Sequence, residues 1–409
     1  MASIPRAGHL DSSLAFLREG YEFVGRRCRS LGVDLFRTRL LGRTFHCAQG
    51  AEAAAMFYHP GRFTRAGALP SSVLKLLQDE GSVATLDAAA HRHRKAMLMS
   101  LMSPAALEDM AARAAVALRR RAESWPARGE VGLHAEFRAS LGEAVCDWAG
   151  LALEPAAQAR LTDQLGAMID NAGRIGPANW IARLRRQGAE RDLARRIAAV
   201  REGRATAPEG SALQVIAFHQ NPDGSLLSEA LAAVELLNIL RPTVAIARFM
   251  VFAALALHEH PAARPGLAEP DRLLAFVQEV RRLAPFFPIV GGIARSGFSW
   301  RGVDFPAGSR FILDLYGTNR DGRSWEAPLE FRPDRFLGWA GNPFTLIPQG
   351  GGDHFTGHRC AGEWLTIAVM QAMLRVLALE LHYQVPPQDL SVDLSRMPAL
   401  PRSGFLVRA

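Results

Sequence analysis

Apolar residues recur every three or four positions between residues 103 and 256, where alanine, leucine and arginine dominate. This spacing gathers apolar side chains on one face of a helix. It predicts amphipathic helices over Pro104–Glu123, Glu130–Ala149, Ala156–Asn171 and Asn179–Glu202. Short segments rich in proline, glycine or asparagine separate them and predict turns.

The longest predicted helix begins near Ser228, a good N-cap residue, and ends at His260, where Pro261 follows. It is mainly apolar, so we expect it to be buried on most sides. Arg241 and Pro242 lie near its middle. Proline lacks a backbone N–H and should kink the helix, and a buried arginine is costly unless an anionic group meets it.

The pattern changes after residue 285. Short β-branched or aromatic runs over Ile289–Ile293 and Phe311–Leu315 predict a few strands. Residues 331–362 read mostly as loop, and a last helix is predicted over Gly362–Leu381. A loop of roughly thirty residues inside a compact domain is usually functional. The sequence therefore predicts a mainly α fold with a minor β part, as a single domain over residues 1–409.

The charge is positive but dispersed. The 409 residues carry 48 Lys+Arg against 40 Asp+Glu, a formal net charge of +8. The basic residues form no long block, so nucleic acid is not an expected partner. The four cysteines lack the spacing of a disulfide framework or a zinc site. The first twenty residues hold no apolar run, and the apolar stretch at 236–257 is interrupted by charge, so we expect a cytoplasmic protein without a membrane anchor.

Cys360 lies in a glycine-rich loop over residues 348–362, directly before the last predicted helix. A cysteine at a helix N-terminus among basic side chains is stabilised as a thiolate. Such a thiolate is a nucleophile or a metal ligand. An inert cysteine buried in a turn is the alternative that the loop alone leaves open.

The loop Gly357-His358-Arg359-Cys360-Ala361-Gly362 resembles the haem-binding loop of the cytochrome P-450 superfamily. The resemblance implies that the Cys360 thiolate is the proximal ligand of the haem iron. Glu279-Val280-Arg281-Arg282 resembles the Glu-x-x-Arg motif of that superfamily, and the segment 331–336 resembles its arginine-bearing loop. Glu279, Arg282 and Arg335 would then form a buried charged triad.

Further positions follow from the same resemblance. His91 and Lys95 lie four residues apart on one helical face and match the position that binds haem propionates. Arg65 is a further propionate partner, and His358 would contact the cofactor from the cysteine loop. The implied cofactor is haem b (iron protoporphyrin IX), between the long central helix and the cysteine loop.

Arg241-Pro242 departs from most of the superfamily, which carries an acidic residue and a threonine there to relay protons to dioxygen. The pair resembles the bacterial fatty-acid peroxygenase branch. By that resemblance Arg241 binds the carboxylate of a free fatty acid, and this carboxylate replaces the missing acid–base group. We expect hydroxylation at the α and/or β carbon with hydrogen peroxide, without a redox partner.

Three residues bear on product and chain binding. Ala84 occupies a position that is often glutamine or histidine in the branch, and histidine there is thought to favour decarboxylation, so Ala84 favours hydroxylation. Phe287 and Ile289 are candidates for lining an acyl channel, or belong to the core. The alternatives are a decarboxylase that forms terminal alkenes, a reductase-dependent monooxygenase and a haem-binding sensor.

Overall fold

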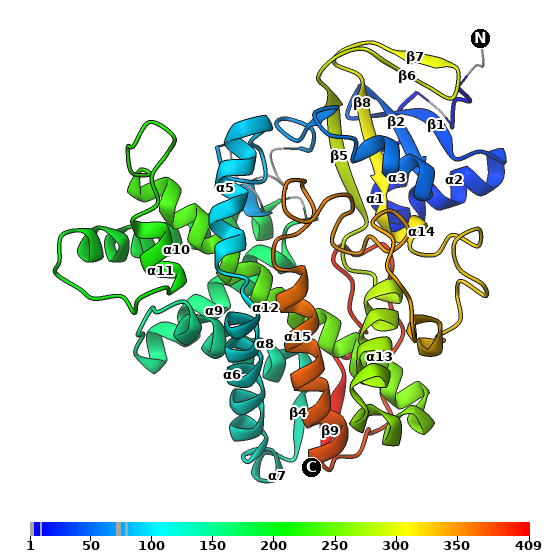
Figure 1. Cartoon of the computed structure of the whole chain (residues 1–409). Coiled ribbons are helices and arrows are strands. Elements are labelled where there is room, and N and C mark those ends of the chain that lie inside the picture. The colour runs from blue at the N-terminus through cyan, green and yellow to red at the C-terminus, as the bar shows by residue number, and fades with distance from the viewer. Residues whose placement is uncertain (1–3, 9, 71–74, 78–80, 175) are drawn as a thin grey trace.

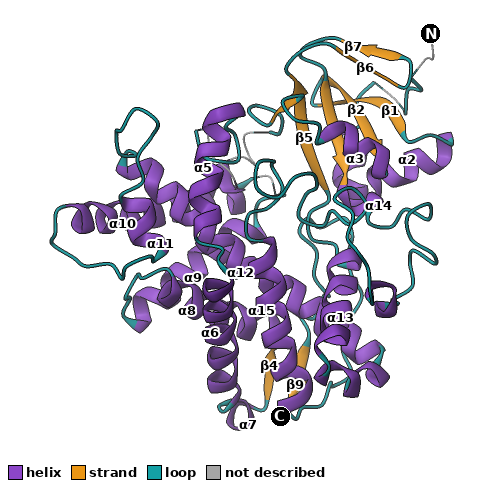
Figure 2. Cartoon of the chain, in the orientation of Figure 1, coloured by secondary structure: helices purple, strands orange, loops and turns teal. Residues whose placement is uncertain are grey.

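The computed structural model describes residues 4–8, 10–70, 75–77, 81–174 and 176–409. Helices surround α12 in the lower and left parts of Figure 1, while the main sheet lies at the upper right, near the N-terminus. Figure 2 separates the two parts by secondary structure.

The helical part is built from these elements: α5 (Ala88–Ser100), α6 (Pro104–Ala122), α7 (Trp125–Arg128), α8 (Leu133–Trp148), α9 (Pro155–Asp170), α10 (Pro177–Arg201), α11 (Ala212–Ala217), α12 (Glu229–Glu259), α13 (Pro270–Leu283) and α15 (Glu363–Arg375). Short 3-10 turns follow α12, at Pro261–Ala263 and Pro265–Ala268, and a π turn at Val376–Glu380 continues α15.

Helix α12 is the centre of the main core. It packs against α8, α9, α10 and α15, and most of its side chains are buried. The Ser228 hydroxyl caps its first turn by accepting from the backbone N–H of Leu231 at 3.2 Å, as the sequence predicted. The helix runs unbroken through Pro242, so the missing N–H does not end it. Because α12 is buried along its length, its apolar composition reflects the core.

Among the described residues, α12 is the one helix long and apolar enough to cross a membrane by length and composition alone. Within the most apolar window, 89% of the residues are buried inside the protein. The core therefore accounts for this apolar stretch.

The predicted helices appear with small shifts, except at residues 130–132. The sequence predicted one helix over Glu130–Ala149, but β4 (Glu130–Gly132) is a strand and α8 begins at Leu133. Strand β4 pairs antiparallel with β9 (Leu406–Arg408) at the chain's far end. Local periodicity could not show this pairing, because its partner is distant in sequence.

The main sheet has the strand order β1-β2-β8-β5-β3. Its strands are β1 (Leu35–Leu40), β2 (Arg43–Gln49), β3 (Phe63–Thr64), β5 (Ile289–Ala294) and β8 (Arg310–Asp314). Strands β2 and β8 run parallel, and the other neighbours are antiparallel. A separate hairpin joins β6 (Phe298–Trp300) and β7 (Val303–Phe305).

The predicted strands at 289–293 and 311–315 match β5 and β8, but the β1–β2 hairpin was missed. Buried and exposed residues alternate from Phe36 to Leu40, and Leu41-Gly42 forms the connection with positive φ at both residues. Short helices flank the sheet: α1 (Ser13–Glu19), a 3-10 turn (Gly20–Glu22), α2 (Phe23–Leu31), α3 (Ala51–Phe57) and α14 (Leu315–Thr318).

The long loop before α15 is mostly irregular, with one 3-10 turn at Pro333–Phe336, as the sequence predicted. Helix α15 begins at Glu363, and Gly362 is its N-cap. The cysteine loop thus ends at a helix that packs against α6, α12 and α13.

Candidate functional site

Cys360 is partly buried at the end of the cysteine loop. Its backbone N–H donates to the carbonyl of Gln349 at 3.1 Å. The side-chain amide of Gln349 donates in turn to the Cys360 sulfur at 3.8 Å and to the Thr366 hydroxyl at 3.0 Å. No local sequence pattern marks Gln349, yet this residue contacts both the backbone and the sulfur of the cysteine.

The surroundings of Cys360 act on the pKa of its thiol in opposite directions. Burial raises the pKa of the Cys360 thiol above its usual value, and the lowering effect of the nearby Lys95 ammonium is smaller. The start of α15 is therefore not enough to deprotonate the thiol. A cation bound at the sulfur would reverse this balance, because a coordinating thiol is deprotonated outright.

Four predicted basic residues gather beside the cysteine loop. The rings of His91 and His358 lie 4.0 Å apart between centroids. The Lys95 ammonium donates to the carbonyl oxygens of Arg359 and, at 3.3 Å, of Gly357. Arg65 lies over the rings of Phe57 and Tyr58, and its charge lowers the pKa of both histidines. The structure thus brings α5 and the cysteine loop together, as the resemblance implied.

The predicted charged triad is also assembled. Glu279 and Arg282 on α13 are fully buried and form a bidentate pair, with nitrogen–oxygen distances of 2.7 and 2.8 Å. Arg335 donates to the same carboxylate at 3.2 Å. Arg282 further donates to the backbone carbonyls of Asn319 and Pro328. The triad joins α13 to the loop that precedes the cysteine.

A second buried network was not predicted. The carboxylate of Glu363, the first residue of α15, accepts from Arg281 and from Arg359, each at 2.5 Å. Arg281 also donates to the Gln349 side chain at 3.0 Å. Glu363 reads in the sequence as an ordinary acidic residue in a first helical turn, so no local signal marked it. This network anchors Gln349, and through it the cysteine.

Arg241 lies midway along α12 and is 5% exposed. Its guanidinium donates to the carbonyl of Leu76 at 3.2 Å, to that of Leu77 at 2.5 Å and to the Asn238 side chain at 3.1 Å. The two carbonyl oxygens belong to residues that are far from α12 in the chain.

Glu235 and Arg94 form a buried ion pair next to Arg241, at 2.8 Å, and both side chains are almost inaccessible to solvent. Arg94 lies on α5, the helix that carries His91 and Lys95. The two residues are 141 positions apart in the chain, so the sequence offered no pattern that links them.

Three solved structures resemble this chain over almost its full length. Cytochrome P-450SP alpha (CYP152B1) in complex with (R)-ibuprophen is 42% identical with a TM-score of 0.94, covering 97% of this chain and 98% of that one. Cytochrome P-450EX alpha (CYP152N1) with myristic acid is 40% identical with a TM-score of 0.94, covering 100% and 99%. This chain belongs to the cytochrome P-450 family, in its CYP152 branch. An OleT variant in complex with arachidonic acid is 35% identical with a TM-score of 0.96, covering 100% and 98%.

Shorter matches agree with this assignment. The family model described as cytochrome P-450 matches residues 272–405. Cytochrome P-450 71D2 of Catharanthus roseus is 30% identical over 139 residues, 33% of this chain and 27% of that protein. Flavonoid 3'-monooxygenase of Petunia hybrida is 37% identical over 120 residues, 27% of this chain and 23% of that protein. The match thus spans about a quarter of the length of these curated relatives.

The family assignment confirms the predicted fold class, a mainly α cytochrome P-450 fold with a minor sheet, and makes the chain a haem-dependent oxidoreductase.

The basic cluster beside the cysteine loop fits the two propionate groups of haem. Desolvation lowers the pKa of His91 to about 4, that of His358 to about 2 and that of Lys95 to about 8. None of the ion pairs among the described residues involves these side chains or Arg65, so the cluster lacks the anions that propionates would supply.

The residues predicted to contact substrate occupy different environments in this cytochrome P-450. Ala84 is half-buried in the segment between residue 81 and α5. Phe287 is 42% exposed, and Ile289 begins β5 half-buried. Phe286, by contrast, packs on Phe249 of α12, with ring centroids 4.4 Å apart.

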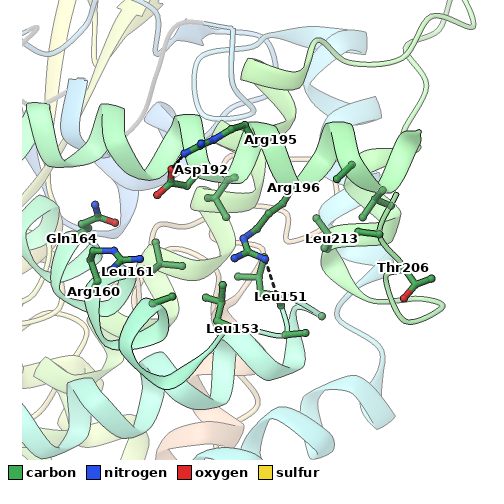
Figure 3. Close-up of a pocket in the computed structure, with 17 residues that line it drawn as sticks. Leu151, Leu153, Arg160, Leu161, Gln164, Asp192, Arg195, Arg196, Thr206 and Leu213 are labelled. Atoms are coloured by element: carbon green, nitrogen blue, oxygen red, sulfur yellow. Dashed lines mark hydrogen bonds and ion pairs between the residues drawn. The ribbon is translucent and has the colours of Figure 1, made fainter. Parts of the chain in front are cut away.

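A separate hollow of about 640 Å³ lies between α9, α10 and the loops beside them (Figure 3). Its floor is leucine-rich, and Arg196 donates across it to the Leu151 carbonyl at 3.3 Å. None of the described site residues named above lines it. The hollow is therefore distinct from the haem site.

Proposed function

We propose that this cytochrome P-450 is a fatty-acid peroxygenase, which uses hydrogen peroxide to hydroxylate free long-chain fatty acids at the α and/or β carbon. The observation that carries the proposal is Arg241, a buried cation in the middle of α12. The structures similar to this chain hold myristic acid, arachidonic acid or ibuprophen, and these three ligands share a carboxylate.

Arg241 suits carboxylate recognition. A guanidinium is planar, permanently charged and able to bind a carboxylate through two parallel N–H donors. Its bonds to Asn238 and to the carbonyls of Leu76 and Leu77 fix the plane of the guanidinium, and a carboxylate bound through two N–H donors would replace one of these acceptors. A pre-oriented donor loses less conformational entropy when its ligand binds. A carboxylate held here would orient the α and β carbons of the acid in the same way in every encounter.

The acid–base step then falls to the substrate. Pro242 has no side-chain donor and Arg241 does not release its proton at neutral pH, so neither residue relays protons. The bound carboxylate takes a proton from hydrogen peroxide and returns it to the departing oxygen. One peroxide and one fatty acid thus give one hydroxy acid and one water. Bound haem, which we expect to be haem b, supplies the oxidising iron, with the Cys360 thiolate favouring O–O cleavage.

The basic cluster and the charged networks hold the cofactor in this proposal. His91, Lys95, His358 and Arg65 would meet the propionates, while Gln349 orients the sulfur of Cys360. Replacing Cys360 by alanine should abolish the absorption spectrum of a thiolate-ligated haem. No redox protein is needed, because peroxide supplies both the oxygen and the oxidising equivalents. The cytoplasmic location stays a prediction.

The test is turnover of purified, haem-loaded protein with myristic acid and hydrogen peroxide, without NADPH or any reductase. The proposal expects hydroxymyristic acid, identified by gas chromatography and mass spectrometry. Terminal alkene as the main product would instead establish the decarboxylase. Product that forms only with NADPH and a reductase would establish the monooxygenase, and absence of any turnover would favour a haem-binding sensor.

A further inference from the structure

Glu235 is a fully buried carboxylate on α12, on the N-terminal side of Arg241. A buried charge is costly unless it is paired and hydrogen-bonded. Here Oε1 accepts from Arg94 at 2.8 Å and from the backbone N–H of Val83 at 2.9 Å. Oε2 accepts from the side-chain amide of Asn238 at 3.1 Å. The carboxylate is thus held from three directions.

This arrangement fixes which way the Asn238 amide faces. An ionised carboxylate accepts hydrogen bonds only, so Asn238 must present its NH₂ group to Glu235. Its carbonyl oxygen therefore faces the other way, where it accepts from Arg241 at 3.1 Å. If the amide were rotated, its NH₂ group would face the N–H donors of Arg241 and the hydrogen bond would be lost. The charge of Glu235 thereby determines the acceptor that Arg241 meets.

A neutral acceptor suits this position. An amide oxygen holds the guanidinium in place without neutralising its positive charge, whereas an aspartate there would compete with the carboxylate of a ligand. Asn238 thus orients Arg241 through a neutral acceptor.

Glu235 also contacts two residues outside α12. Val83, whose N–H it accepts, directly precedes Ala84. Arg94 belongs to α5, the helix of His91 and Lys95. One carboxylate therefore connects the helix of the basic cluster, the segment of Ala84 and the arginine of α12.

We propose that Glu235 and Asn238 are positioning residues that orient Arg241 for carboxylate binding. Glu235 sets the direction of the Asn238 amide, and Asn238 sets the plane of the guanidinium. The inference rests on the proposed function, since it assigns carboxylate binding to Arg241.

The test is a spectral titration of haem-loaded protein with myristic acid and, in parallel, with 1-tetradecanol, which has the same chain without the carboxylate. Asn238→Leu and Glu235→Gln should each weaken myristic acid binding by about tenfold to a hundredfold, the loss expected for a hydrogen bond to a charged group. Binding of the alcohol should stay unchanged. In turnover, the KM for myristic acid should rise more than kcat falls.

Two controls separate positioning from stability. Ser228→Ala removes the cap of the same helix at its far end, and should leave both ligands unaffected. Asn238 is only partly buried and does not take part in the Glu235–Arg94 ion pair, so Asn238→Leu decides the question even where Glu235→Gln fails to fold.

The outcomes distinguish the two proposals. Equal weakening of acid and alcohol would overturn the positioning role, because a general packing defect does not select for the carboxylate. Normal acid binding by Asn238→Leu, together with its loss in Arg241→Ala, would also overturn that role and leave the proposed function standing. Normal acid binding by Arg241→Ala would refute both.

Discussion

Two charged regions flank the cysteine loop, and they differ in whether their charged side chains form ion pairs within the protein. On one side, Glu279 and Glu363 each accept from two arginine side chains, so both buried carboxylates are paired within the protein. On the other side, His91, Lys95, His358 and Arg65 gather without a carboxylate at ion-pair distance among the described residues. The first region is complete without a ligand and braces the fold. The second contains Lys95 and Arg65 without a paired carboxylate and is suited to an anionic ligand.

The largest effect should come from breaking the complete region. Glu279→Ala leaves Arg282 buried without its carboxylate, which costs about 3–5 kcal/mol of the free energy of unfolding. Urea unfolding of the purified protein measures the loss. Glu326→Ala is the matched control, because it removes an exposed partner of Arg332 and should change stability little. Equal stability of the two variants would contradict the bracing role of the triad.

The second region should respond differently. The double variant with His91→Leu and Lys95→Met should lose haem faster, by roughly tenfold to a hundredfold, because charge-assisted bonds to the propionates disappear. The stability of the haem-free form should change little, since the desolvation cost of the two bases offsets the hydrogen bonds that Lys95 donates to the cysteine loop. Haem transfer to apomyoglobin and thermal unfolding measure these two quantities. Unchanged haem retention would remove these residues from the cofactor site.

The smallest effect concerns pH. In the haem-free protein the pKa of His91 is lowered to about 4, chiefly by desolvation, from an unfolded value near 6.5. Between these values the unfolded chain binds a proton that the folded chain does not. The free energy of unfolding must therefore fall as the pH falls through this window.

Urea unfolding of haem-free protein, repeated between about pH 7 and about pH 5, measures how the free energy of unfolding changes with pH. The variant His91→Leu should show a shallower dependence than the wild type, and haem-loaded protein should do so as well, because propionates favour the charged imidazole. Parallel curves for the variant and the wild type would show that His91 does not titrate abnormally.

The sequence predicted those parts of the molecule that depend on local patterns. The helical periodicity located α6, α9, α10 and α12, and the cysteine loop together with Glu-x-x-Arg located Cys360, Glu279 and Arg282. The β4–β9 pair was not predicted, because residues 130 and 408 are too far apart in sequence for a local pattern to connect them.

The sequence predicted the motif residues of the site but not the residues that hold them in place. Gln349, Glu363 and Glu235 have ordinary sequence surroundings, and their roles arise from partners brought close by folding, such as Arg94. The pKa of the Cys360 thiol could not be predicted from sequence either, because the burial that raises it is a property of the tertiary structure.

The central claim is that Arg241 binds the carboxylate which the reaction uses as its acid–base group. The most direct measurement is peroxide-driven turnover of myristic acid and 1-tetradecanol by haem-loaded wild type and Arg241→Ala, with the haem spectrum recorded for each. The account predicts that the wild type converts the acid but not the alcohol. It also predicts that Arg241→Ala loses turnover of the acid by about a hundredfold or more while its haem spectrum is retained. Efficient turnover of the acid by Arg241→Ala, or of the alcohol by the wild type, would contradict it.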